Sequence, residues 1–144
     1  MGPRAFAAGG VGAAHLSGDD IALHASYFAQ GSGYWHGLGA LFVRGRGARL
    51  QSRRYGLGTG VHTAVGALDI QGDDAHIEAW GVGPGFAWDY GVGLFRLRGD
   101  RARLRSDWAD GRAALGGRAL AWIEGSDARL SLAEFGSGSF TRAQ

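Results

Sequence analysis

Hydrophobic and polar residues alternate along most of this chain, and the alternation returns at a nearly constant distance. Five alternating segments begin at residues 21, 48, 75, 102 and 128, so successive copies are 27, 27, 27 and 26 residues apart. In the second copy, Ala48, Leu50 and Ser52 alternate with Arg49 and Gln51. A period of two is the signature of a β-strand with one buried face, and a fixed repeat length predicts structural units that stack.

Aliphatic residues occupy equivalent positions in every copy. Three such columns are Leu23, Leu50, Ile77, Leu104 and Leu130; Leu16, Val43, Ile70, Leu97 and Ile123; and Ala14, Leu41, Leu68, Phe95 and Ala121. The opposite strand face has His24, Gln51, Glu78, Arg105 and Ser131. We expect neighbouring copies to lie alongside one another, so that the aliphatic columns bury themselves and the polar column faces water.

Glycine accounts for 28 of the 144 residues and also recurs in columns. One column consists of Gly12, Gly39, Gly66 and Gly93, with Ala119 in the fifth copy. We interpret it as a place where two backbones approach closely rather than as the wall of a ligand cavity. Glycine at this density disfavours helices, and no stretch has a helical period. The sequence therefore predicts an all-β, single domain over residues 1–144, with copies near 10–36, 37–63, 64–90, 91–116 and 117–140.

Two architectures fit this repeat. In a parallel β-helix each 26–27-residue copy is one coil, and equivalent residues stack about 4.8 Å apart. In the alternative, a ten-stranded antiparallel meander closes into a barrel through two-residue hairpin turns. The odd repeat length favours the β-helix, because a slip of one residue inverts the faces of a strand and a hairpin would need a bulge in every copy.

The charges also favour the β-helix. Hairpins would place Arg98 opposite Arg101 and Glu124 opposite Asp127, which are unfavourable like-charge pairs. Parallel stacking instead places Arg98 over Glu124 and Glu78 over Arg105. The least favourable column of that register is Arg49, His76, Arg103 and Arg129. Against the β-helix, the repeats leave no polar cap, and exposed sheet edges would allow self-association.

Composition excludes several classes of protein. The chain has no Cys, so disulfide scaffolds and cysteine metal sites are absent, and no apolar run is long enough for a membrane-spanning helix or a signal peptide. All 15 basic residues are Arg, against 13 acidic residues, giving a net charge of +2. Along the sequence the Arg residues alternate with acids and form no stripe backed by aromatic residues. We therefore do not expect nucleic acid as the partner.

Two segments resemble coils of a known protein family. Residues 39–52 (GALFVRGRGARLQS) and 91–106 (GVGLFRLRGDRARLRS) are similar to the passenger domains of bacterial autotransporters, particularly the pertactin-like adhesins. The resemblance covers about residues 9–135. It implies a right-handed parallel β-helix exported to the surface of a Gram-negative bacterium, commonly for adhesion or immune evasion. The long glycine-rich strands also resemble outer-membrane β-barrels.

Two features are candidate binding sites. Arg98-Gly99-Asp100 is the tripeptide that integrins recognise, although the repeat also has Gly-Asp at other turns. Aromatic residues gather at the variable end of the copies, where rings beside glycine loops can stack on sugars or partner surfaces. The aromatic candidates are Tyr34, Trp35, Trp80, Trp88, Tyr90 and Trp108.

Catalytic signals are weak, so we expect no catalytic residue, metal or cofactor. The five His residues lie apart in the sequence without metal-ligand spacing. A barrel register would pair His62 with Asp89 as an acid and base. The leading hypothesis is a non-enzymatic surface or secreted domain that binds a protein or glycan partner. The alternatives are a transmembrane barrel of the outer membrane and a soluble barrel that binds a small hydrophobic ligand, such as a cyclase or isomerase. A cytoplasmic location stays open.

Overall fold

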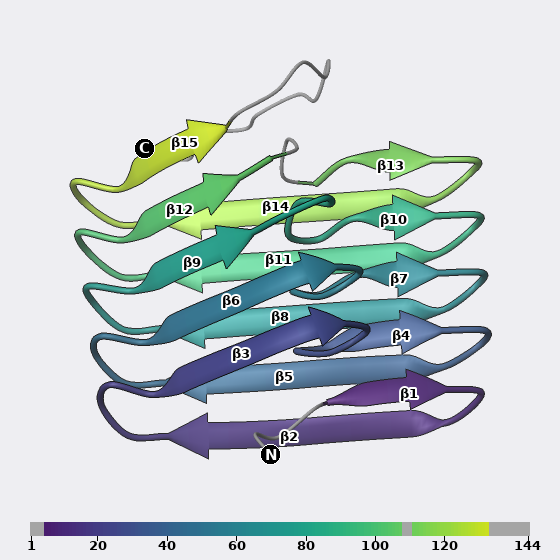
Figure 1. Cartoon of the computed structure of the whole chain (residues 1–144), viewed down its shortest axis with the longest axis horizontal. Helices are drawn as coiled ribbons and strands as arrows, with labels where there is room; N and C mark the ends of the chain where they lie inside the picture. Colours follow the sequence, from purple (N-terminus) through teal and green to yellow (C-terminus); the bar gives the residue numbers. More distant parts are fainter. Residues whose placement is uncertain (1–4, 108–110, 133–144) are drawn as a thin grey trace.

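The computed structural model describes residues 5–107 and 111–132, which form a parallel β-solenoid of five stacked coils (Figure 1). Each coil contributes one strand to each of three sheets. The described residues contain no helix, which confirms the all-β prediction, and accordingly none long and apolar enough to cross a membrane. The coils rise from the purple N-terminal end of the stack to its yellow C-terminal end.

The strands recur in the same order along the chain. Sheet A contains β1 (Phe6–Ala8), β4 (Ser32–Tyr34), β7 (Gly60–Val61), β10 (Ala87–Trp88) and β13 (Ala113–Ala114). Sheet B contains β2 (Val11–Ser17), β5 (Leu38–Arg44), β8 (Val65–Gln71), β11 (Val92–Arg98) and β14 (Arg118–Glu124). Sheet C contains β3 (Ala22–Tyr27), β6 (Arg49–Arg54), β9 (His76–Ala79), β12 (Arg103–Ser106) and β15 (Arg129–Leu132).

Every strand pair among these is parallel and joins equivalent positions of adjacent coils. Leu50 pairs with Ile77, and Ile77 pairs with Leu104, as the repeat predicts. The antiparallel barrel is therefore wrong for this chain. A barrel would have needed a bulge in every hairpin to keep one face apolar, whereas a coil keeps its apolar face inward without one. Both functions considered for a barrel would have required that fold.

The aliphatic columns form the core between the sheets. Leu41, Val43, Leu50, Ile70 and Ile77 are completely or almost completely buried in the central coils. Burial decreases toward the ends of the stack, where Leu130 is 44% exposed. The exposure follows from the parallel topology, because only an inner coil has a described neighbour on both sides.

Glycine brings sheets A and B into direct backbone contact. A Cβ atom added to Gly39 would overlap the carbonyl oxygen of Ser32, and one added to Gly66 would overlap that of Thr59. Ser32 begins strand β4, and Thr59 immediately precedes strand β7, so the close approach is between the backbones of these two sheets. This contact confirms the interpretation of the glycine column as a packing device.

Sheet A was not predicted from the sequence. Its strands are only two or three residues long and carry small residues such as Gly33, Gly60 and Ala87 in place of an aliphatic run. Short segments of this composition have little β propensity of their own. They are extended because the equivalent segments of adjacent coils satisfy their backbone hydrogen bonds, for example Gly33 N–H to Thr59 O at 2.9 Å.

Candidate functional site

The turn from sheet A to sheet B, here called the A–B corner, has an unusual backbone. It comprises residues 35–36, 62–63, 89–90 and 115–116 in four successive coils. Both residues of each corner have positive φ, and the seven that are not glycine are Trp35, His36, His62, Thr63, Asp89, Tyr90 and Leu115. The left-handed region is unfavourable for residues with a Cβ, above all for a β-branched residue such as Thr63.

Hydrogen bonds between coils hold this strained backbone in place. His36 N–H donates to His62 O at 3.2 Å, and Thr63 N–H donates to Asp89 O at 2.9 Å. The next corner repeats the bond, from Tyr90 N–H to Leu115 O at 3.0 Å. Strained positions persist only where their surroundings enforce them, and they concentrate at functional sites. The column of corners therefore presents large side chains in fixed positions.

Polar side chains of the A–B corner pair between adjacent coils. His62 Nδ1 lies 2.6 Å from Asp89 Oδ2, and Thr63 Oγ1 lies 2.6 Å from His36 Nδ1. The His62–Asp89 pair predicted for a barrel thus forms, but on the outer surface of a coil. His36 and Thr63 were not predicted as site residues, although their 27-residue separation placed them in one column.

Aromatic rings surround these polar pairs. The ring of Tyr34 lies 5.7 Å from that of Trp35 and 5.2 Å from that of His62, centroid to centroid. The rings of Phe28 and Tyr55 stack nearby at 5.1 Å, and Phe28 also contacts Tyr34. Trp35 nevertheless keeps 61% of its surface exposed and Tyr90 keeps 70%. The corner therefore combines exposed rings with hydrogen-bonding groups.

Comparisons with protein-family models, curated proteins and solved structures gave no match.

The structure brings together some of the aromatic candidates and separates others. Tyr34, Trp35 and Tyr90 lie at or beside the A–B corner, and Trp88 lies in β10 of sheet A. Trp80 follows β9 of sheet C, and no ring contact within the described residues joins it to the corner. Trp108 lies outside the residues that the structure describes.

The Arg98-Gly99-Asp100 tripeptide occupies the turn from sheet B to sheet C. Asp100 Oδ1 accepts the N–H of Ser126 in the next coil at 2.8 Å. Asp73 Oδ1 makes the same bond to Asp100 N–H at 3.0 Å, so the carboxylate belongs to a ladder between turns. Arg98 is partly buried, and its Nε has no hydrogen-bond partner among the described residues. The repeat thus accounts for the Gly-Asp sequence, and integrin binding stays a prediction.

One ionic cluster lies on the outer face of sheet B. Asp69 accepts hydrogen bonds from Arg96 at 2.7 and 2.9 Å and from Arg44 at 2.8 Å, while its own residue is only 7% exposed. Burial alone would raise the pKa of Asp69, but the hydrogen bonds and charges of the two Arg residues outweigh it and hold the pKa below 3.8. The carboxylate neutralises two cations on adjacent strands.

We expect Asp69→Asn to lower the free energy of unfolding by about 2 kcal/mol at pH 7, because it removes hydrogen bonds between charged groups. The lowered pKa means that this stabilisation is complete above the unfolded-state pKa, near 3.9, and is lost as pH falls through the folded-state pKa. Chemical denaturation of both proteins at pH 7 and pH 3 measures the difference. Asp127→Asn, which removes an exposed carboxylate at the turn from sheet B to sheet C, is the control. A constant difference at both pH values would contradict the ionic account.

No group of three or more His, Asp or Glu side chains in residues 5–107 and 111–132 is arranged to hold a metal ion. The polar side chains of the A–B corner form two pairs, His62 with Asp89 and His36 with Thr63, and the Thr63 hydroxyl also donates to the carbonyl oxygen of His62. Such pairs can accept and donate hydrogen bonds to hydroxyl groups. This chemistry, next to exposed rings, suits recognition of a polyhydroxylated ligand.

Proposed function

We propose that this chain is a non-enzymatic binding domain of a surface or secreted protein and that it binds a glycan at the A–B corner. The exposure of Trp35 and Tyr90, at 61% and 70%, on a backbone fixed by bonds between coils is the observation that carries the proposal. Large rings held rigidly in solvent lose little conformational entropy when a partner covers them.

The side chains at the corner offer two kinds of contact to a sugar, an apolar surface and hydrogen-bonding groups. The indole of Trp35 offers a flat apolar face to the carbon–hydrogen face of a sugar ring, and Tyr34 supports it from behind by ring contact. The pairs His62–Asp89 and His36–Thr63 offer donors and acceptors to sugar hydroxyls. Because the corner repeats along the stack, an extended glycan can contact several coils at once.

The resemblance of the repeat to autotransporter passenger domains supports a location at the surface of a Gram-negative bacterium. A stiff parallel stack suits display, since it holds equivalent side chains at a regular spacing of about 4.8 Å. Binding along such a scaffold is multivalent, so the overall affinity for an extended glycan exceeds the affinity of any single contact.

We expect Trp35→Ala to weaken glycan binding at least tenfold, which corresponds to about 1.4 kcal/mol. Titration calorimetry with cellohexaose, xylohexaose, mannohexaose and maltohexaose measures the affinities of the wild-type and variant proteins. Trp122→Ala is the matched control, because Trp122 is also exposed, at 46%, but lies on sheet B. Unchanged affinity in the Trp35 variant, or a folded wild-type protein that binds none of these neutral glycans, would contradict the proposal.

A further inference from the structure

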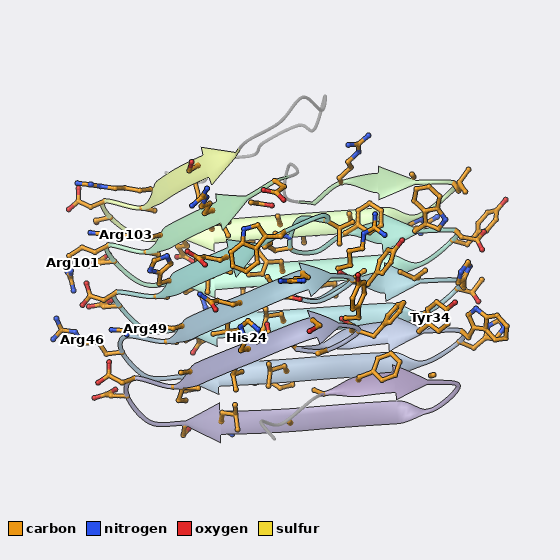
Figure 2. The ribbon with its side chains drawn as sticks, in the orientation of Figure 1. His24, Tyr34, Arg46, Arg49, Arg101 and Arg103 are labelled. Carbon is orange, nitrogen blue, oxygen red and sulfur yellow. The ribbon has the colours of Figure 1, made fainter. Side chains whose placement is uncertain are left out.

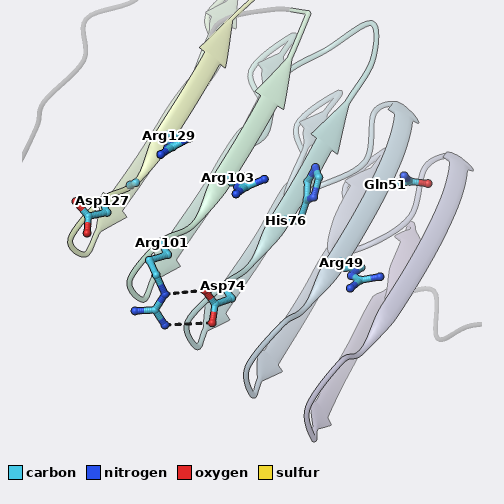
Figure 3. A pocket seen from close by; sticks show the side chains of 9 residues that line it. Arg49, Gln51, Asp74, His76, Arg101, Arg103, Asp127 and Arg129 are labelled. Atoms are coloured by element: carbon cyan, nitrogen blue, oxygen red, sulfur yellow. Dashed lines mark hydrogen bonds and ion pairs between the residues drawn. The ribbon is translucent and has the colours of Figure 1, made fainter.

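A column of four basic side chains follows the long direction of the stack on sheet C. Arg49, His76, Arg103 and Arg129 are in register on strands β6, β9, β12 and β15, and all four are exposed (Figure 3). Neighbouring strands are about 4.8 Å apart, so Arg103 and Arg129 are held closer than the Debye length of about 8 Å. Arg49 lies two strands from Arg103, with His76 between them. We call these four residues the cation column.

Two other groups of Arg residues are neutralised within the protein. Asp69 lies between Arg44 and Arg96 on sheet B. At the turns, Asp74 receives hydrogen bonds from Arg101 and Arg46, which lower its pKa to about 2. In both groups one carboxylate pairs with two Arg residues and relieves the repulsion between them.

The cation column has no comparable compensation. Within the described part of the chain, no carboxylate forms an ion pair with Arg49, Arg103 or Arg129. His76 alone has an acidic neighbour, with Nε2 at 3.4 Å from Glu78 Oε1. Like charges directly opposite one another destabilise a sheet. The column is thus unfavourable for the isolated fold and favourable for an anion that lies along it.

The side chains of the column also line a hollow of about 1080 Å³. Asp74, Asp127 and Gln51 lie in the same lining, and Figure 3 shows Asp74 bound to Arg101 at its edge. The hollow therefore offers cations together with carboxylate and amide groups. Carboxylate and amide oxygens accept hydrogen bonds from hydroxyl groups, which a sugar chain carries along its whole length.

We propose that the cation column binds an acidic polysaccharide, whose chain lies across the strands of sheet C, parallel to the stack. Its sulfate or carboxylate groups pair with Arg49, Arg103 and Arg129, and its hydroxyl groups bond to the polar residues of the hollow. A single-stranded nucleic acid fits less well, because such ligands also need large aromatic side chains on which successive bases stack, and the lining has no Phe, Tyr or Trp.

This site goes beyond the neutral glycan site at the A–B corner and is independent of it. In Figure 2 the labelled Tyr34 lies at the right-hand end of the coils, whereas Arg49, Arg101 and Arg103 lie toward the left. The two surfaces belong to different sheets and share no residue. Each can therefore be removed by substitution without altering the other.

The test compares two triple variants of equal charge. R49Q/R103Q/R129Q removes the cation column, whereas R53Q/R54Q/R118Q removes three exposed Arg residues outside the hollow. The probes for calorimetry at physiological salt are a heparin-derived hexasaccharide, hexaguluronate, maltohexaose and a thymidylate hexamer. Hexaguluronate carries carboxylates alone and the heparin fragment carries sulfates as well, so these two probes show whether sulfate is needed. Maltohexaose tests whether the ligand must be charged, and the thymidylate hexamer tests whether a nucleic acid binds instead.

We expect the wild-type protein to bind at least one of the acidic hexasaccharides. The column variant should lose on the order of 100-fold in affinity, because three charge-assisted contacts disappear. The control variant should lose less than about threefold, as expected for rim charges. The column variant should keep or gain thermal stability, since like charges have been removed. Trp35→Ala should leave acidic binding unchanged, which separates failure of this site from failure of the corner site.

Three results would overturn the proposal. The first is an absence of binding to both acidic hexasaccharides. The second is an equal loss in both triple variants, which would mean that net charge alone attracts the ligand. The third is tighter binding of the thymidylate hexamer than of either acidic sugar, which would assign the column to nucleic acid.

Discussion

Gly66→Ala should lower the melting temperature by about 10 °C, which corresponds to a loss of about 3 kcal/mol. The Cβ of the new residue would overlap the carbonyl oxygen and carbon of Thr59, which are backbone atoms without freedom to rotate away. Sheets A and B must therefore separate locally, and the loss of contact spreads to the coils on either side. Thermal unfolding followed by circular dichroism measures the change.

Gly10→Ala is the control for this substitution. No heavy atom lies within 4 Å of a Cβ added at Gly10, so this variant should melt within about 2 °C of the wild-type protein. The last coil has Ala119 in the Gly66 column, and beside it an added Cβ meets the facing backbone less closely. A Cβ on Gly85 would lie 2.9 Å from Leu120 O, a wider gap than that between Gly58 and Leu94 O. If Gly66→Ala melts like Gly10→Ala, the close approach of the two sheets is not essential.

Ile77→Ala should destabilise the fold by about 3 to 4 kcal/mol, because it opens a cavity in the middle of an aliphatic column. Ile77 is fully buried and pairs with Leu50 on one side and Leu104 on the other. The surrounding residues cannot collapse into the space, since each is fixed in its own coil by hydrogen bonds. Urea denaturation gives the free energy of unfolding directly.

The matched control lies in the same column at the end of the stack. Leu130 is 44% exposed, so Leu130→Ala removes as many side-chain carbons as Ile77→Ala but leaves no closed cavity. We expect its cost to be below about 1 kcal/mol. Equal effects of Ile77→Ala and Leu130→Ala would show that burial does not increase toward the centre of the stack, contrary to the structure.

The repeat made sheets B and C predictable. Residues such as Leu50 and Ile77 alternate with polar neighbours, and one-sided burial is the physical cause of that alternation. Equal spacing of the copies then specified the register, including the pairs Arg98 over Glu124 and Glu78 over Arg105. Patterns that arise from burial can be read without a structure, and these two sheets are built from such patterns.

Sheet A and the A–B corner could not be predicted in the same way. The backbone of Trp35, Thr63 and Tyr90 is left-handed although none of them is Gly, Asn or Asp, the residues that usually reveal this conformation. Bonds between coils impose it, so the cause lies outside the local sequence. The cluster of Arg44, Asp69 and Arg96 was also missed. The repeat places Arg96 beside Asp69, but the hydrogen bond from Arg44 crosses from one column to the next, and the repeat does not reveal such a diagonal contact.

The parallel pairing of each strand with its equivalent one coil away makes the length of the protein adjustable. An in-frame duplication of 27 codons would insert another coil, lengthen the stack by about 4.8 Å and leave the existing pairs intact. Gain or loss of whole copies during evolution can therefore adjust the length of the binding surface to the length of its ligand in steps of one coil.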